Sequence, residues 1–176
     1  MPGIDATRSF IPLQIAVLTV SDTRTMDTDR SGDILIQRLR DAGHHLAERC
    51  IVADEIDHIT GQLRAWIADE RIQVILTTGG TGITGRDITP EACKLLFDKD
   101  IPGFGEVFRY QSYQTIGTST IQSRALAGLA GKTLIFALPG STGACKDAWD
   151  GILSEQLDAR FRPCNFVDLM PRLGER

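Results

Sequence analysis

The segment 77–91, with the sequence TTGGTGITGRDITPE, combines residue types that suit phosphate chemistry. Four of the seven residues from Gly79 to Gly85 are glycines, which let a backbone approach a ligand closely. Thr89 and Pro90 are expected to cap and begin a helix, and the N–H groups at such a helix end attract anions. Asp87 lies within the same loop, and a carboxylate beside a phosphate requires a cation between them. The segment therefore predicts a metal-assisted phosphate or nucleotide site, and the alternative is a glycine-rich turn without a ligand.

The dinucleotide-binding fingerprint matches this segment only in part. Gly80, Gly82 and Gly85 have its spacing, but the expected helix begins late, at Pro90. The acidic residue that binds the ribose would fall within 97–100, which does not resemble the end of a strand. A nicotinamide site is therefore a weak alternative.

The phosphate-binding P-loop fits no better. The glycine spacing of 80–85 agrees with it, but the positions of its lysine and its hydroxyl residue hold Arg86 and Asp87. Loss of the lysine that reaches the phosphates and of the hydroxyl that holds Mg²⁺ argues against a P-loop nucleotide hydrolase.

The elements that must position this loop follow the pattern of an α/β fold. Apolar runs at 14–20, 46–52 and 72–77 predict buried strands. They alternate with helical patterns that start near Ser31 and after Asp54, so we expect parallel strand–helix–strand units with helices on both faces of the sheet. Gly131 and Lys132 have the pattern of a two-residue hairpin turn. That hairpin, between 125–130 and 133–138, adds an antiparallel strand to a mostly parallel sheet.

Three further helices are expected in the second half of the chain. The helix at Pro90 should face the core through Ala92, Leu95, Leu96 and Phe97. A turn at 102–106 should open a helix that buries Val107, Phe108 and Tyr110. The last helix should bury Ala144, Ala148, Trp149, Ile152, Leu153 and Leu157.

The chain is expected to form one domain at 13–170, preceded by an arm at 1–12. With 176 residues and 42% hydrophobic content, one domain can bury most of its apolar surface. Phe10 and Ile11 are the residues of the arm that we expect to dock onto it.

Composition narrows the class of partner. The net charge of −4 does not favour a nucleic-acid partner, and a phosphate ligand would have to be attracted by local donors and a metal. Four cysteines without metal-ligand spacing indicate reduced, mostly buried thiols in a cytosolic protein. We expect neither an export signal nor a membrane span.

Polar side chains follow the predicted strands at their carboxyl ends, where open α/β sheets bind ligands. They are Ser21, Asp22, Asp54 and the segment Pro139-Gly140-Ser141. Asp54 and Asp87 are thus expected to meet and to hold Mg²⁺, which prefers carboxylates together with substrate phosphates. The alternatives are a helix cap for Asp54 and a turn residue for Asp87, and Asp22 is a further candidate ligand.

Other polar side chains are weaker candidates. Arg24, Arg86 and Arg124 offer bidentate phosphate donors, although each is more often a solvated charge. The hydroxyls that can bind a polar ligand or cap turns are Thr78, Thr81, Ser119 and Ser141. His44, His45 and His58 are interpreted as surface residues.

Five motifs in this chain together resemble the MoaB/MogA family of molybdenum cofactor biosynthesis proteins. They are LTVSD at 18–22, TTGGTGITGRDITPEA at 77–92, PGFGE at 102–106, SR at 123–124 and LPGS at 138–141. The resemblance covers about 13–165. The segment 118–120, the whole C-terminal half and the closing segment 162–166 are most similar to the MoaB branch.

The resemblance implies a three-layer α/β/α fold, trimers or hexamers, and binding of molybdopterin. It further implies that, as in the MogA branch, molybdopterin is adenylylated with Mg-ATP and pyrophosphate is released. The two aspartates essential in that branch fall on Asp54 and Asp87 by motif position. Some MoaB proteins lack one or both, whereas this chain has both.

We therefore expect a molybdopterin adenylyltransferase in which Asp54 and Asp87 are catalytic and hold Mg²⁺, with ATP as co-substrate. The expected substrate-binding residues are Ser21, Asp22, Thr78, Gly79, Gly80, Thr81, Gly82, Thr89, Glu91, Gly103, Gly105, Glu106, Ser119, Arg124, Pro139, Gly140 and Ser141. The alternative is a non-catalytic molybdopterin carrier or scaffold, and other molybdenum cofactor biosynthesis proteins are candidate partners.

Overall fold

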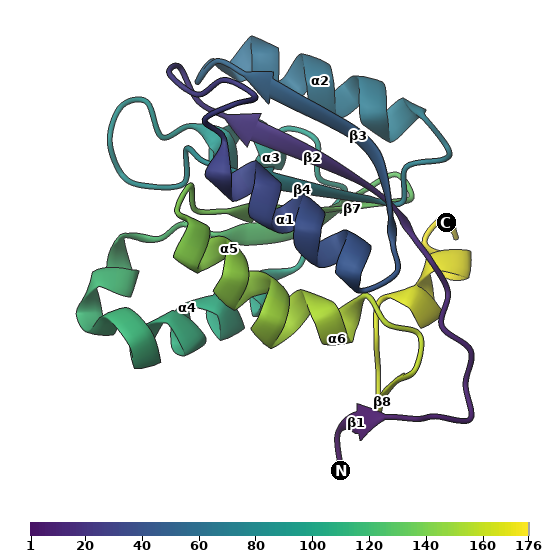
Figure 1. Ribbon diagram of the computed structural model, residues 1–176. Coiled ribbons are helices and arrows are strands. Elements are labelled where there is room, and N and C mark those ends of the chain that lie inside the picture. Colours follow the sequence, from purple (N-terminus) through teal and green to yellow (C-terminus); the bar gives the residue numbers. More distant parts are fainter. Residues whose placement is uncertain (176) are drawn as a thin grey trace.

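A computed structural model describes residues 1–175 and shows three layers, with helices on both faces of one sheet (Figure 1). The strands are β1 (Gly3–Ile4), β2 (Gln14–Val20), β3 (His45–Val52), β4 (Val74–Thr78), β5 (Lys99–Asp100), β6 (Leu126–Ala130), β7 (Thr133–Leu138) and β8 (Phe161–Arg162). The α-helices are α1 (Arg30–Asp41), α2 (Ile56–Ala68), α3 (Thr89–Lys94), α4 (Pro102–Ile116), α5 (Thr142–Ala148) and α6 (Ser154–Gln156). Two 3₁₀-helices, η1 (Gly117–Gln122) and η3 (Val167–Arg172), and the π-helical turn η2 (Trp149–Leu153) complete the chain.

The predicted α/β sheet is confirmed. Its order is β3-β2-β4-β7-β6-β5, with β3, β2, β4 and β7 parallel and β6 and β5 antiparallel to their neighbours. The hairpin at Gly131 is present, and its φ of 61° is the left-handed conformation that glycine tolerates. The strand β5 was not expected, since two polar residues at the edge of the sheet have no hydrophobic pattern to predict them.

Alternate side chains of the strands enter two cores, one on each face of the sheet. On one face Leu35 of α1, Phe104 and Phe108 of α4 and Trp149 of η2 pack against Phe136 and its neighbours. On the other face Leu63 and Trp66 of α2 and Ala92 of α3 pack against the inner strands. Burial of apolar surface on both faces explains why β2, β4 and β7 are apolar along nearly their whole length.

Several predicted burials are wrong because the helices present a narrower apolar face than the sequence suggested. Helix α3 has six residues, and Leu95, just beyond its end, is exposed. In α4 the buried positions are Phe104, Gly105, Phe108 and Ser112, all on one side of the helix, whereas Val107 and Tyr110 face outward. The expected burials in the last helix are confirmed, except that Ala144 is only partly buried.

The N-terminal arm is tied to the C-terminal part of the chain. Strand β1 pairs with β8, and Phe10 lies 5.0 Å from the ring of His44. Ile11 remains exposed. The expectation that His44 is a surface residue is wrong, because its ring is buried between Phe10 and Trp149 and its Nδ1 accepts a hydrogen bond from the Leu13 N–H.

The cysteines Cys50, Cys93, Cys145 and Cys164 are all free thiols. Two of them, Cys93 and Cys145, are buried, and burial raises their pKa to about 12 and about 11. Among residues 1–175, no helix combines the length and the apolar character that a membrane crossing requires.

Candidate functional site

The carboxyl ends of the parallel strands meet at one edge of the sheet. The registers Thr19↔Thr78 and Thr78↔Leu138 bring the ends of β2, β4 and β7 level with one another. The loops that follow these strands therefore gather beside the glycine-rich segment. This is the position that the sequence predicted for the site.

The glycine-rich loop begins with two residues in the left-handed conformation. Gly79 has a φ of 102° and Gly80 a φ of 65°. A Cβ on Gly79 would lie 2.2 Å from the Val20 carbonyl oxygen, so this position requires glycine. The Thr89 hydroxyl donates to the Gly79 carbonyl, which fastens the start of α3 to the start of the loop.

Two assignments of helix caps are corrected here. Thr89 does not cap α3, because Ile88 occupies that position and the Thr89 hydroxyl is turned back to the loop. Asp54 does not cap α2, because Glu55 precedes the helix and makes no side-chain cap bond. The main alternative to a functional role for Asp54 is thereby removed.

Asp54 lies against the loop, with its carboxylate beside Gly80. A Cβ on Gly80 would lie 3.3 Å from Asp54 Oδ1, and within residues 1–175 no Lys, Arg or His forms an ion pair with this carboxylate. Burial and the nearby carboxylate of Asp22 raise its pKa. A raised pKa on a partly buried carboxylate is a common feature of functional sites.

Asp87 lies on the other side of the loop and is held in place by it. Its Oδ2 accepts hydrogen bonds from the Thr84 hydroxyl at 2.6 Å and from the Thr84 N–H at 2.9 Å. These bonds, the hydroxyl first, lower the pKa of Asp87. A Cβ on Gly82 would lie 2.7 Å from Asp87 Oδ2, so the absence of a side chain at Gly82 makes room for the carboxylate. The turn role proposed as the alternative for Asp87 is thus real, because the carboxylate accepts both bonds from Thr84.

Asp22 connects the two sides of the site. Its carboxylate accepts the Asp54 N–H at 3.0 Å and forms an ion pair with Arg86 at 2.6 Å, which lowers its pKa. Asp22 thus holds the backbone of Asp54 in place. The positive charge of Arg86 offsets the negative charge of the Asp22 carboxylate.

Arg124 binds the opposite side of the loop. Its Nε donates to the Gly82 carbonyl at 2.6 Å, another guanidinium nitrogen donates to the Asp87 carbonyl, and the group forms an ion pair with Glu91 of α3. The Arg124 N–H donates to the Thr81 carbonyl at 2.9 Å. With its donors used in this way, Arg124 shapes the loop rather than offering a free phosphate donor.

The loop borders a cavity of about 400 Å³, here called the loop cavity. Eight predicted site residues line it: Gly80, Thr81, Gly82, Asp87, Ser119, Pro139, Gly140 and Ser141. The N–H groups of Gly80 and Thr81 make no hydrogen bond within residues 1–175 and are available to an anion. This arrangement can bind phosphate through backbone donors with carboxylates beside it.

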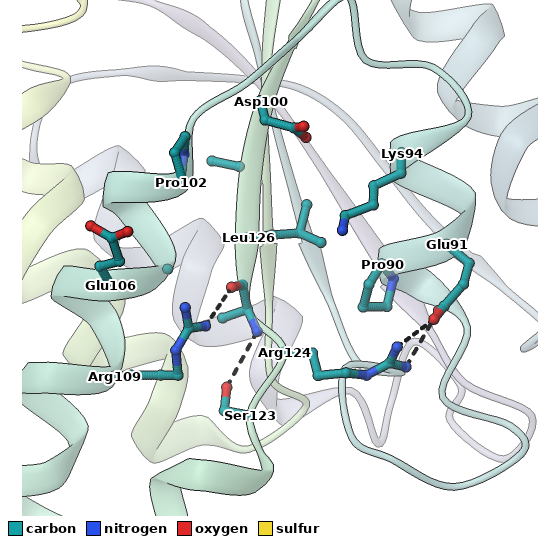
Figure 2. A pocket seen from close by; sticks show the side chains of 13 residues that line it. Pro90, Glu91, Lys94, Asp100, Pro102, Glu106, Arg109, Ser123, Arg124 and Leu126 are labelled. Carbon is teal, nitrogen blue, oxygen red and sulfur yellow. Dashed lines mark hydrogen bonds and ion pairs between the residues drawn. The ribbon is translucent and has the colours of Figure 1, made fainter.

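A second cavity of about 560 Å³ lies between α3, α4 and β6, and we call it the charged cavity (Figure 2). The predicted residues Glu91, Gly105, Glu106 and Arg124 line it. Figure 2 shows Lys94 of α3 pointing into the space across from Glu106 and Arg109 of α4. Ser123 lines both cavities, so the two are neighbours.

Other predicted residues have structural roles or lie elsewhere. The Thr78 side chain is fully buried and donates to the Pro139 carbonyl at 3.0 Å, so its prediction as a ligand is wrong. The buried Thr89 hydroxyl likewise has its partner in Gly79. The Ser21 hydroxyl accepts the N–H groups of Thr23 and Arg24, and Ser141 caps α5. Gly103 lies in a third, apolar cavity on the far side of α4's first turn.

Several cavity residues were missed from the sequence. The polar ones are Ser112, Thr120, Gln122 and Ser123 in the loop cavity, and Lys94, Asp100 and Arg109 in the charged cavity. Gln122 and Ser123 lie in the polar segment next to Arg124, which could have indicated them. The others lie on a helix or an edge strand and have no local signal.

The residues present fit Mg²⁺ held jointly with a phosphate ligand. Within residues 1–175, no three acidic, histidine or cysteine side chains cluster closely enough to form a metal cage. Mg²⁺ keeps few protein ligands when it is bound with phosphates, and Asp54 with Asp87 supplies that number beside free N–H donors. These two aspartates would hold the ion.

Comparison with known proteins agrees with this geometry. The family model described as a "probable molybdopterin binding domain" matches residues 16–159. Molybdenum cofactor biosynthesis protein B of Escherichia coli K12 is 55% identical over 157 residues, which cover 89% of this chain and 92% of that protein. A crystal structure of molybdenum cofactor biosynthesis protein B has a TM-score of 0.86 at 37% identity and covers 96% of this chain and 100% of its own. A MogA structure has a TM-score of 0.75 at 32% identity, covering 82% and 94%.

Proposed function

The chain belongs to the MoaB/MogA family of molybdopterin-binding domains, and from this premise we propose that it binds molybdopterin and adenylylates it with Mg-ATP. The molybdenum cofactor biosynthesis named for its relatives is the process in which it would act. Its place of action would be the cytosol.

One observation carries the enzymatic part of the proposal. Two carboxylates, Asp54 and Asp87, flank a loop that presents the free N–H groups of Gly80 and Thr81. Binding of a phosphate chain requires N–H donors, and the cation that accompanies it requires carboxylates. A module that only carried the pterin would need N–H donors for the pterin's own phosphate but not a pair of carboxylates beside them.

The nucleotide is assigned to the loop cavity. The N–H groups of Gly80 and Thr81 would bind phosphate oxygens, and Ser141 with Gly140 would line the opposite wall. Mg²⁺ held by Asp54 and Asp87 would neutralise phosphate charge, which a protein of net charge −4 cannot do through its overall field.

The pterin is assigned to the charged cavity, whose free groups match its polar edge. In this cavity Lys94, Asp100 and Glu106 have no ion-pair partner within residues 1–175, whereas Glu91 and Arg124 are paired with each other. A pterin ring presents N–H donors beside a carbonyl oxygen, and a carboxylate with an ammonium group is complementary to that edge. Ser123, shared by both cavities, marks where the pterin's phosphate would approach the nucleotide.

The reaction would be an in-line displacement. A phosphate oxygen of molybdopterin forms a bond to the α-phosphorus of ATP, the bond between that phosphorus and the bridging oxygen breaks, and pyrophosphate leaves with the electron pair. The protein's part is to align the two phosphates and stabilise the spreading charge, which supplies most of the rate in such transfers.

The test is incubation of the protein with molybdopterin and Mg-ATP, followed by chromatography for adenylylated pterin. Wild type should form product, and Asp87→Ala and Asp54→Ala should bind pterin but form none. If wild type and Asp87→Ala bind pterin equally and neither forms product, the enzymatic proposal fails.

The second candidate function is a pterin carrier or scaffold. It is favoured by the hydrogen bonds from Thr84, which give the Asp87 carboxylate a structural role without any metal. It predicts tight pterin binding that does not change with nucleotide and does not depend on Asp54. Saturable NAD binding in calorimetry would instead favour an oxidoreductase.

We also propose that the protein forms a homo-oligomer through α4. Val107, Tyr110, Tyr113 and Ile116 recur every three residues along this helix, and all are exposed. So many exposed apolar side chains on one helix are unusual on a monomer. Sedimentation should show trimers or hexamers, and Tyr110→Glu should shift the population to monomers. Other cofactor biosynthesis proteins would be transient partners.

A further inference from the structure

The Arg124 guanidinium has an unusual set of partners. Its contacts to the carbonyls of Gly82 and Asp87 join the two ends of the segment 82–87, and its contact to Glu91 fixes it to helix α3. Arg124 therefore links the two ends of the segment 82–87 and joins them to α3. Its side chain is 34% exposed, so the group is partly shielded from water.

The direction of these bonds decides what the loop offers a ligand. Carbonyl oxygens repel a phosphate, whereas N–H groups attract it. The backbone N–H of Arg124 donates to the Thr81 carbonyl, and its guanidinium donates to the carbonyls of Gly82 and Asp87. These bonds keep the three carbonyls on the Arg124 side of the loop. The N–H groups of Gly80 and Thr81, which border the loop cavity, stay free.

We propose that Arg124 is a positioning residue that preorganises the loop for an anion, with Glu91 as its anchor. It acts through the loop and does not touch the reacting phosphates. The proposal rests on the proposed function in assigning a pyrophosphate-bearing ligand to the loop cavity. The ordering of the loop by Arg124 does not depend on that assignment.

A control exists elsewhere in the chain. Arg38 forms a bidentate ion pair with Asp150. The side chains of Arg38 and Asp150 are 28% and 52% exposed, which is close to the 34% of Arg124 and the 51% of Glu91. Arg38 makes no contact with a loop carbonyl. Comparison of Arg124→Ala with Arg38→Ala thus separates loop ordering from the loss of a surface ion pair.

The first measurement is hydrogen exchange of the segment 79–91 in the unliganded full-length protein. We expect exchange there to be at least tenfold faster in Arg124→Ala than in wild type, with the remaining segments unchanged. Arg38→Ala should leave 79–91 unchanged. If the exchange of 79–91 in Arg124→Ala equals that of wild type, the proposal is overturned, whatever the protein binds.

The second measurement is calorimetry with magnesium pyrophosphate. We expect Arg124→Ala to bind about tenfold more weakly, with partial recovery on addition of millimolar guanidinium, which can occupy the vacated space. Arg38→Ala should bind like wild type and show no response to guanidinium. If Arg124→Ala had merely lost its fold, guanidinium would not restore pyrophosphate binding. Absence of this recovery, or unchanged pyrophosphate binding in Arg124→Ala, would overturn the role of Arg124 in ligand binding.

The two measurements separate the two hypotheses. If wild type binds no pyrophosphate but Arg124→Ala accelerates exchange at 79–91, the assigned ligand is wrong and the loop-ordering role stands.

Discussion

Replacement of Gly82 by alanine tests how the loop holds Asp87. Gly82 does not have a positive φ, so the backbone itself accepts alanine. The added Cβ would lie 2.7 Å from Asp87 Oδ2, closer than Cβ atoms come to a neighbour, and 3.0 Å from its Cγ. Asp87 must therefore move away and weaken its bonds to the Thr84 hydroxyl and N–H.

The size of the effect follows from those bonds. A hydrogen bond to a charged group contributes about 1.5–3 kcal/mol, and the lower end applies because Asp87 is only partly buried. We expect Gly82→Ala to lower the free energy of unfolding by about 1.5 kcal/mol. Displacement of the carboxylate should also weaken binding of Mg-ATP roughly tenfold, which corresponds to about 1.4 kcal/mol.

Urea unfolding and calorimetry with Mg-ATP measure the two quantities. Gly85→Ala is the matched control, because a Cβ there meets nothing within 4 Å, and its stability should change by no more than about 0.5 kcal/mol. If Gly82→Ala binds Mg-ATP as tightly as Gly85→Ala, the inference that Gly82 makes room for a functional Asp87 is refuted.

Three further predictions concern stability. Gly79→Ala should lower the free energy of unfolding by about 3 kcal/mol or prevent folding, since φ is 102° and the Cβ would lie 2.2 Å from the Val20 carbonyl oxygen. Urea unfolding measures this loss. In the same assay Gly61→Ala in α2 should be neutral or stabilising. Burial lowers the pKa of His44 from 6.5 to about 4. As the pH falls, the imidazole therefore binds a proton in the unfolded chain before it does so in the folded protein. About 3 kcal/mol of stability should be lost between pH 6.5 and 4. His44→Gln should lack that part of the loss, and an equal pH dependence in both proteins would contradict the assignment. Asp29→Asn should destabilise the protein by about 3 kcal/mol, because this buried carboxylate accepts hydrogen bonds from Thr19, Gly32 and Arg49. Asp150→Asn at the surface should cost less than about 1 kcal/mol.

The fold was accessible from the sequence where the pattern is local. The apolar runs of β2 and β4 and the Gly131 turn have periodicities and turn residues that depend only on neighbours in the chain. Strand β5 and the pairing of β1 with β8 depend on partners far away in sequence, and their two-residue lengths leave no pattern. The exposure of Val107 and Tyr110 was missed because an apolar residue on a helix is compatible with a core or with an interface.

The site was predictable in its location but not in the direction of its side chains. Strand ends and glycine spacing placed the loop, Asp54 and Asp87 together. Tertiary contacts decide whether a polar group faces a ligand or the backbone. Thr78, Thr89 and Arg124 illustrate this, because their side chains donate hydrogen bonds to loop carbonyls. Residues such as Lys94 and Asp100, which enter the charged cavity from a helix and an edge strand, had no motif to indicate them.

The most direct test of the central proposal is a single-turnover reaction with molybdopterin and Mg-ATP, in which adenylylated pterin and pyrophosphate are both quantified. We expect them to form in equal amounts with wild type, and neither to form with Asp54→Ala, Asp87→Ala or when Mg²⁺ is removed by a chelator. Tight pterin binding by wild type without either product would contradict the assignment and leave a carrier.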